Sequence, residues 1–413
     1  MHFQDPLGRR RVVVTGMGVV MPHGTGLDVA WPRLCAGESG IGAITRFDTR
    51  DYKTKIAGEA RDFVPEHFFD LKEIRRNDRC LLFGMAAAEL AVQQAGFRVA
   101  TAEAERVGVI VGSGLGGLET LEHNRTLVSQ RGPSRLSPFF IAAVIPNLIP
   151  GKISIRYGAK GPNWTPVSAC ASGAHAIGEA LETIRRGTCD AVICGGAEAT
   201  ITPLGIGGFN AMKALSTRND APEKACRPWD EQRDGFVMSE GAGIVVLESL
   251  ERAQRRDAPI LAELVGYATT SDAHHITTPS GEGAERCMLA TLRNAALHPE
   301  QVEYINAHAT STPVGDLQEA QAIKAIFTTH DVMVSATKSM HGHLLGASGA
   351  VELILTIEML RRGVILPTIN LEHPSAGCDL NVVKSCAEHP ITTALSNSFG
   401  FGGTNVALAV RRW

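Results

Sequence analysis

The sequence has no apolar run of about 18 residues, so it predicts no helix that spans a membrane. Its first residues, MHFQDPLGRR, lack the apolar stretch of a secretory signal peptide. The 40 Lys+Arg and 43 Asp+Glu nearly balance, which argues against a protein that binds nucleic acid or a membrane over its whole surface. We therefore expect a cytoplasmic protein, or the mature form of an organellar one.

The nine cysteines include no C-x-x-C pair, which argues against a zinc site and favours a reducing compartment over a disulfide framework. Aromatic residues make up only 5% of the chain, but apolar residues reach 44%, enough for a large core and too many for global disorder. Glycine is abundant, with 43 residues. This excess predicts many tight turns or close backbone contacts.

Strand-like and helix-like segments alternate along the chain, which is typical of an α/β fold. Short β-branched or apolar runs predict strands at 11–15, 107–111, 191–194 and 244–247, and helical spacing predicts a helix at 79–96. The strand at 11–15 is expected to end at Gly16 and Gly18.

Two segments, 167–187 and 334–363, both begin with VSA, turn through small residues, continue as an apolar helix and end at RRG. This weak repeat predicts that the second half of the chain has the topology of the first. The alternative is a chance similarity between two buried strand–helix units. The charged segment 251–259 is the best boundary, which divides the chain into domains 1–255 and 256–413.

Cys170 follows a strand-like run, 164–168, and precedes a helix with an apolar stripe of Ile177, Leu181 and Ile184. A thiol at a helix N-terminus is expected to have its pKa lowered below about 8.5, and the free N–H groups there suit an oxyanion. The alternative is a structural cysteine, since free cysteines are often buried. The small neighbours on both sides leave room for a ligand and favour the nucleophile.

Two histidines and a lysine lie in comparable settings beside small residues: His308 in YINAHATSTPVGD, and Lys338 and His343 in TKSMHGHLLGASG. A metal site of His341 and His343 is weakly supported, because no third ligand is obvious. Glu352 lies inside an apolar helical run, where a carboxylate needs a partner such as Lys338 or His308 unless that helix face reaches water.

Four motifs in this order, SACASG, NAHATSTPVGD, TKSMHGHLLGASGAVE and NSFGFGGTN, resemble the β-ketoacyl-acyl-carrier-protein synthases of the thiolase superfamily, and the synthase II type in detail. The resemblance extends from about Arg10 to the end. It implies an α/β thiolase fold of duplicated halves in five αβαβα layers. It also implies a homodimer that elongates fatty acids by decarboxylative condensation of malonyl-carrier protein with a Cys-bound acyl chain.

The resemblance assigns roles to individual residues. Cys170 corresponds to the nucleophile, His308 and His343 to the pair that stabilises the enolate, and Lys338 with Glu352 to the network around His308. Asp316 and Glu319 correspond to acids that brace the histidine loop, and Thr310 and Thr312 to residues that bind the pantetheine arm. Phe399 and Phe401 correspond to residues beside the substrate, with Phe401 as a gate. Leu115 corresponds to a residue of the acyl pocket. The N–H groups of Cys170 and Phe401 would form the acyl oxyanion hole. For Leu115, ordinary core packing is an equal alternative.

The implied substrates are acyl and malonyl thioesters on the phosphopantetheine of acyl-carrier protein, with no covalently bound cofactor and no metal. Carrier proteins of this family are acidic, and the basic residues Lys72, Arg75, Arg76, Arg79 and Lys213 match docking positions. A solvated charged face is the ordinary alternative.

Some positions depart from the family pattern. Ala309 replaces a commoner glycine and His341 a commoner threonine. Trp164 and Pro166 lie on the strand that, by the resemblance, pairs across the dimer, and proline removes a backbone donor there.

Four other functions share part of this pattern. A ketosynthase of a polyketide or other specialised pathway would carry the same catalytic residues. A non-catalytic chain-length factor would lack the nucleophile. Lys338 and the two histidines oppose a thiolase, and the absence of a clear water-activating base opposes a cysteine hydrolase.

Overall fold

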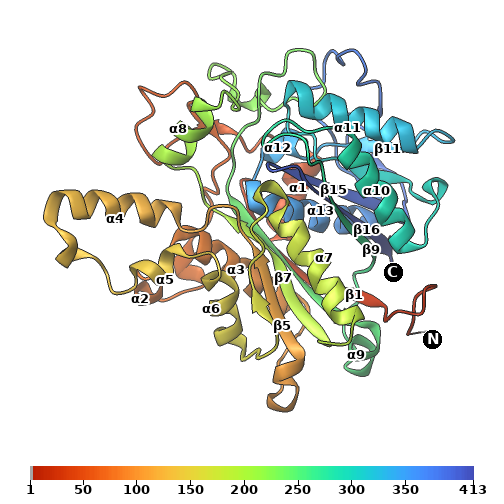
Figure 1. Cartoon of the computed structure of the whole chain (residues 1–413), viewed down its shortest axis with the longest axis horizontal. Helices are drawn as coiled ribbons and strands as arrows, with labels where there is room; N and C mark the ends of the chain where they lie inside the picture. The colour runs from red at the N-terminus through yellow and green to blue at the C-terminus, as the bar shows by residue number, and fades with distance from the viewer. Residues whose placement is uncertain (1–2) are drawn as a thin grey trace.

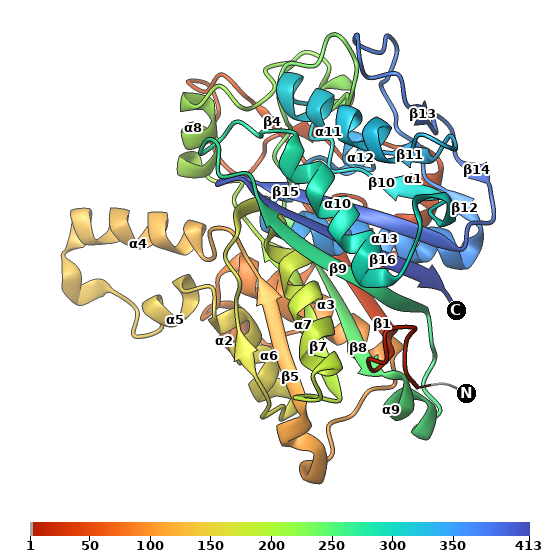
Figure 2. The same cartoon turned by 45° about the vertical axis from the view of Figure 1, so that its right-hand side comes forward.

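The computed structural model describes residues 3–413, and its elements occur in the same order in both halves (Figures 1 and 2). The first half contains β1 (Val12–Met21), α3 (Arg79–Gln94), β5 (Val107–Gly112), α6 (Leu148–Tyr157), β6 (Asn163–Trp164), α7 (Ser172–Arg185), β7 (Ala191–Glu198) and β8 (Gly241–Ser249). The second half contains β9 (Ala262–Ser271), α10 (Glu282–Ala295), β10 (Tyr304–Asn306), α11 (Pro313–Ile326), β11 (Met333–Ser335), α13 (Ser348–Arg362), β15 (Thr393–Gly400) and β16 (Thr404–Arg412).

Strand order confirms the predicted duplication. The first half has the order β6-β5-β7-β8-β1 and the second β11-β10-β15-β16-β9, with parallel and antiparallel pairs at equivalent places. β13 (Asn381–Val382) extends the second half beyond β11. The first residues of β1 pair with β9 as well as β8, so the two halves form one continuous sheet. The matching helices begin at SGA and end before a glycine in both halves, at 172–187 and 348–363.

The helices produce the five layers that the resemblance implied. The central pair, α7 and α13, contacts strands of both halves and forms one apolar core cluster with them. α3 and α6 cover the outer face of the first half, and α10 and α11 that of the second, each over a core cluster of its own. None of the helices in residues 3–413 is long and apolar enough to cross a membrane.

β1 continues past the point where its glycines were expected to end it. The strand runs to Met21, through Gly16 and Gly18, with an irregular register between Val14 and Gly16. A Cβ at Gly16 would lie 2.1 Å from the Ala91 carbonyl oxygen of α3. These glycines therefore allow close contact between helix and sheet instead of a turn.

The central helices meet at their N-termini. Each is preceded by one turn of 3₁₀ helix, Ala169–Ala171 before α7 and Leu345–Ala347 before α13. A Cβ at Gly173 would lie 2.8 Å from the Gly346 carbonyl oxygen, and one at Gly349 2.8 Å from the Ala174 Cβ. Both glycines are thus required for the two turns to lie against each other.

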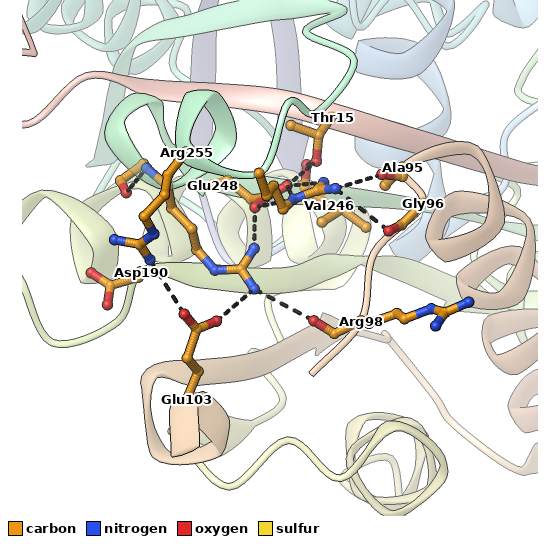
Figure 3. A network of polar contacts seen from close by, with 12 residues as sticks. Thr15, Ala95, Gly96, Arg98, Glu103, Asp190, Val246, Glu248 and Arg255 are labelled. Atoms are coloured by element: carbon orange, nitrogen blue, oxygen red, sulfur yellow. Dashed lines mark hydrogen bonds and ion pairs between the residues drawn. The ribbon is translucent and has the colours of Figure 1, made fainter. Parts of the chain in front are cut away.

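The charged segment between the halves is anchored. It contains α9 (Leu250–Arg255), and the buried Glu248 carboxylate of β8 accepts hydrogen bonds from Arg252, from Arg256 Nε at 2.9 Å and from Thr15 Oγ1 at 2.6 Å. Figure 3 shows Glu248 beside Thr15, with the carbonyl groups of Ala95 and Gly96 nearby. These charges tie the connection to the first half, so it is no loose linker.

Candidate active site

A cavity of about 450 Å³ brings together residues from both halves of the chain. Its lining includes Cys170 from the first half and His308 and His343 from the second. The predicted substrate residues Thr310, Thr312, Phe399 and Phe401, with Glu319 and Lys213, also line it. The residues of the second half come together because β10, β11 and β15 are neighbouring parallel strands whose carboxyl ends meet at one edge of the sheet.

Cys170 lies in the 3₁₀ turn before α7, and the strand-like run expected at 164–168 is shorter than predicted, since β6 ends at Trp164. Ala169 has φ 50°, an uncommon value for a residue with a Cβ. The turn is held by Ser172, whose Oγ donates to the Ala169 carbonyl at 2.7 Å and accepts from the Ser168 N–H at 2.9 Å. The thiol is thereby presented to the cavity.

The expected lowering of the Cys170 pKa is wrong for this structure. Burial raises the pKa of the thiol to about 12, although Lys338 and the backbone N–H of Cys170 itself act to lower it. Desolvation disfavours the charged thiolate more than the nearby cation and N–H groups favour it. The resting thiol is therefore neutral near pH 7.

His308 follows β10, and its ring contacts the buried ion pair of Lys338 and Glu352. Lys338 Nζ donates to Glu352 Oε1 and lies 3.4 Å from His308 Nδ1. Burial raises the pKa of Glu352 to about 7, while Lys338 acts to lower it. The carboxylate thus has the partner that the sequence required, and the alternative of a solvated helix face is excluded because Glu352 is fully buried.

His343 also lines the cavity and is held by main-chain and side-chain contacts. Its main-chain N–H donates to the Val237 carbonyl at 2.7 Å, and its ring Nδ1 lies 2.9 Å from Ser348 Oγ. Its ring centroid is 5.4 Å from that of His308 and 5.4 Å from that of Phe236. The two histidines are therefore close enough to act on one small group.

Both rings are neutral near pH 7. Burial lowers the pKa of His308 and of His343 well below 6.5, and the positive charge of Lys338 lowers both further. A neutral imidazole has one N–H donor and one acceptor nitrogen. With Nδ1 of each ring next to a polar partner, Nε2 is the nitrogen left to act in the cavity.

Two buried acids hold the loop that carries His308. Glu319 accepts from the N–H groups of His308 and Ala309 at 2.9 and 2.7 Å, and from Asn397 Nδ2 at 3.0 Å. Asp316 accepts from the N–H groups of Ser311 and Thr312 at 3.1 and 3.2 Å. They therefore fix the backbone on both sides of Thr310.

The two threonines and two phenylalanines lie together along the cavity. Thr310 Oγ1 and Thr312 Oγ1 are 3.2 Å apart, on either side of Ser311, whose φ is 72°. The Phe399 ring contacts His308 at 5.6 Å between centroids. Phe401 is 36% exposed and precedes Gly402 and Gly403, both with positive φ, so its loop has the backbone freedom that a gate requires.

Two of the predicted substrate and docking residues lie elsewhere than expected. Arg79 forms an internal ion pair with the buried Glu240 at 2.7 Å and donates to the Ala60 carbonyl, so its charge is not available to a docking partner.

Leu115 does not line the cavity, and its side chain is 48% exposed in the single chain. Lys72, Arg75 and Lys213 are exposed, and the Arg76 guanidinium lies 4.1 Å from the centre of the Phe139 ring.

His341 is a structural neighbour of the site. Its Nδ1 lies 2.7 Å from the Gly342 carbonyl and must donate there, so Nε2 accepts from Thr337 Oγ1 at 3.1 Å. Neither of these ring hydrogen bonds reaches a cavity histidine. Residues 3–413 also contain no cluster of three His, Cys, Asp or Glu arranged for a metal.

A buried acid of the first half was missed by the sequence reasoning. Glu198, at the end of β7, is buried and accepts from the N–H groups of Gly114, Leu115 and Gly346 at 2.7, 3.1 and 3.1 Å. Burial raises its pKa to about 7. It joins the glycine-rich loop of the first half to the turn before α13. The sequence feature that could have revealed Glu198 is the one that pointed to Glu352: a single acidic residue within an apolar segment.

Near the ion pair of Lys338 and Glu352, three buried oxygens have no hydrogen-bond partner in the described part of the chain: Glu352 Oε2, Ser396 Oγ and Asn397 Oδ1. Hard cations prefer oxygen ligands, so this is where a cation or ordered water would fit. Asn306 belongs to the same region but is already bonded, through Nδ2 to Thr356 Oγ1 at 3.1 Å.

Known proteins resemble the whole chain. The family model described as "Beta-ketoacyl synthase, N-terminal domain" matches residues 9–253, and that described as "Beta-ketoacyl synthase, C-terminal domain" matches residues 261–372. The 3-oxoacyl-[acyl-carrier-protein] synthase 2 of Coxiella burnetii is 50% identical over 409 residues, 98% of this chain and 99% of the relative. That of Synechocystis is 48% identical over 412 residues, again 98% and 99%.

Solved structures agree with the fold. A β-ketoacyl synthase from Burkholderia phymatum has a TM-score of 0.92 and 35% identity, with 98% of this chain and 99% of the other covered. A ketosynthase of a type II polyketide system, solved with its acyl-carrier protein, has a TM-score of 0.90 and 33% identity over 98% of this chain and 100% of the other. The predicted thiolase-type α/β fold is confirmed.

The raised pKa of Cys170 can be tested by alkylation. Because only the thiolate reacts, the rate with iodoacetamide is expected to rise about tenfold per pH unit from pH 7 to 9 without levelling off. The measurement follows the modified peptide by mass spectrometry, with Cys170→Ala as the control for the other eight thiols. A plateau below pH 8.5 would restore the low pKa expected from the sequence.

Proposed function

Because this chain belongs to the β-ketoacyl synthase family, we propose that it is a 3-oxoacyl-[acyl-carrier-protein] synthase, an acyltransferase that elongates fatty acids by decarboxylative condensation. One observation carries the assignment of residues: Cys170 shares a cavity with two neutral histidines whose Nδ1 atoms face polar partners. The relatives named 3-oxoacyl-[acyl-carrier-protein] synthase 2 are 48–50% identical, against 33% for the polyketide ketosynthase. This difference favours fatty-acid elongation over the polyketide alternative.

In the first half-reaction, Cys170 Sγ attacks the acyl thioester on the carrier. The carbon–sulfur bond to pantetheine breaks, and the thiol proton of Cys170 ends on the pantetheine sulfur. The oxyanion formed on the way accepts from the N–H groups of Cys170 and Phe401. The neutral resting thiol fits this transfer, because no net charge enters the buried site.

In the second half-reaction, malonyl-carrier protein loses carbon dioxide, and the electrons of the broken bond form an enolate. Nε2–H of His308 and of His343 donate to the thioester oxygen as its charge grows. The carbanion then attacks the acyl carbonyl on Cys170, and the Cys170 sulfur leaves as a thiolate, which takes one proton from solvent to restore the neutral thiol. No base is needed to remove an α-proton, which agrees with a site whose histidines both act as donors.

No resident cofactor enters this scheme, since the substrates arrive as thioesters on phosphopantetheine. Thr310 and Thr312 are the proposed contacts for that arm. The exposed apolar side chains of Met212, Ile276 and Val314, which also line the cavity, support entry of the arm from this side. We propose a reducing compartment, the cytoplasm, because the nine cysteines include no C-x-x-C pair.

The half-reactions separate the proposed roles. Cys170→Ala is expected to abolish both acylation and condensation. His308→Ala and His343→Ala are each expected to lower malonyl decarboxylation about 10²–10³-fold, the usual effect of losing one oxyanion donor, while acyl-Cys170 still forms. Intact mass spectrometry measures acylation, and carbon dioxide release measures decarboxylation. Lost acylation with full decarboxylation in the histidine variants would refute the assignment.

We propose that acyl-carrier protein, the partner of the similar ketosynthase, docks on Lys72, Arg75, Arg76 and Lys213. Lys213 lines the cavity, and the cluster around Arg75 is exposed beside the apolar Leu71, which is 61% exposed. An acidic carrier would find charge and apolar surface together there. Arg79 is left out because Glu240 neutralises it.

Charge reversal tests the docking surface. Arg75→Glu with Arg76→Glu is expected to raise the KM for carrier-protein substrates about tenfold and to weaken its salt dependence, with kcat little changed. Arg50→Glu is the control, because Arg50 is an exposed arginine outside the cluster. Equal KM values for the two variants would remove the docking assignment.

We further propose a homodimer that pairs through β6. This strand forms one edge of the sheet, and Trp164 and Val167 are 38% and 61% exposed. Pro166 lies beyond the last strand residue, so its missing N–H does not interrupt the strand. The exposed Leu115 and Ile141, from segments on either side of α4 (Leu118–Arg131), supply further apolar surface.

Sedimentation equilibrium tests the dimer. Trp164→Arg is expected to shift the mass from two chains toward the 44.0 kDa of one, because it places a charge in an apolar interface. Trp413→Arg is the matched control, since Trp413 is similarly exposed but lies at the C-terminus. A wild-type chain that sediments as a monomer would contradict the proposal.

A further inference from the structure

Ser348 is the first residue of α13, a place where a serine ordinarily serves the helix backbone. Its side chain is buried, and its Oγ lies 2.9 Å from His343 Nδ1. We propose that Ser348 is a positioning residue that holds His343 in the tautomer with its proton on Nε2. This inference rests on the function proposed above.

The internal duplication makes the role of Ser348 visible. Ser172 is its equivalent at the start of α7, and both serines follow a 3₁₀ turn and precede Gly-Ala. Ser172 Oγ bonds to the main chain at Ala169 and Ser168. Ser348 Oγ instead contacts a catalytic ring, although its place in the fold is the same. The hydroxyl has therefore been turned from the backbone toward His343.

The direction of the hydrogen bond follows from the need of a buried hydroxyl to donate its proton. Within residues 3–413, His343 Nδ1 is the one hydrogen-bond partner that Ser348 Oγ has. The hydroxyl therefore donates, and Nδ1 accepts, because buried donors rarely stay unpaired. An imidazole that accepts at Nδ1 carries its proton on Nε2, the atom that must donate to the enolate oxygen.

The two histidines thus receive equivalent help from different residues. Lys338 Nζ faces Nδ1 of His308 at 3.4 Å, and Ser348 Oγ faces Nδ1 of His343. A cation next to both rings would favour neutral imidazoles but would add a second buried charge. A neutral hydroxyl sets the tautomer of His343 without that cost.

The test compares Ser348→Ala with Ser348→Thr in single-turnover experiments on the full chain. Acylation of Cys170 by acyl-carrier protein and carbon dioxide release from malonyl-carrier protein are measured separately. Ser348→Ala is expected to slow decarboxylation about tenfold, the value of one hydrogen bond, and to change the acylation rate less than about twofold. Ser348→Thr keeps the hydroxyl and is expected to restore most of the decarboxylation rate.

Three results would overturn the inference. Decarboxylation by Ser348→Ala at the wild-type rate would show that the hydroxyl is not used. Equal losses in Ser348→Ala and Ser348→Thr, or an equal loss of acylation, would show that Ser348 acts through packing of the turn. Failure of the wild-type chain to decarboxylate malonyl-carrier protein would instead overturn the proposed function itself, and the inference with it.

Discussion

The contact between the N-termini of α7 and α13 is the constraint on which the site depends. Gly173 and Gly349 occupy equivalent positions in the two halves, and each faces backbone or Cβ atoms of the opposite helix at distances that leave no room for a side chain. The turns that precede the helices therefore lie against each other. One turn carries Cys170 and the other follows His343, so the packing of two helices brings the nucleophile to the histidines.

Burial sets the chemistry of what is brought together. It keeps the Cys170 thiol and both histidines neutral, and it leaves Lys338 as the cation that acts on all three. Glu352 compensates that cation, and Glu198 and Glu319 hold the surrounding loops through backbone N–H groups. A site of this kind stabilises charge only when a substrate develops it, which is the condition for catalysis by pre-oriented donors.

Much of this could be predicted from the sequence. Alternation of strands and helices indicated the α/β fold, and the repeat ending in RRG indicated the duplication, although its apparent register differed from the structural one. The motifs around Cys170, His308 and His343 indicated residues that do line one cavity. Ser348 and Glu198 escaped notice, because a serine at a helix start and an acid at a strand end have ordinary structural uses.

The sequence by itself determined which chemical groups are present and which local element carries each, because periodicity and turn residues act over a few neighbours. Only the tertiary structure decided how those groups behave. The Cys170 pKa is raised because distant segments exclude water, and Arg79 is neutralised by Glu240 from another part of the chain. Desolvation and long-range pairing depend on residues far apart in the chain, and local sequence does not encode their proximity.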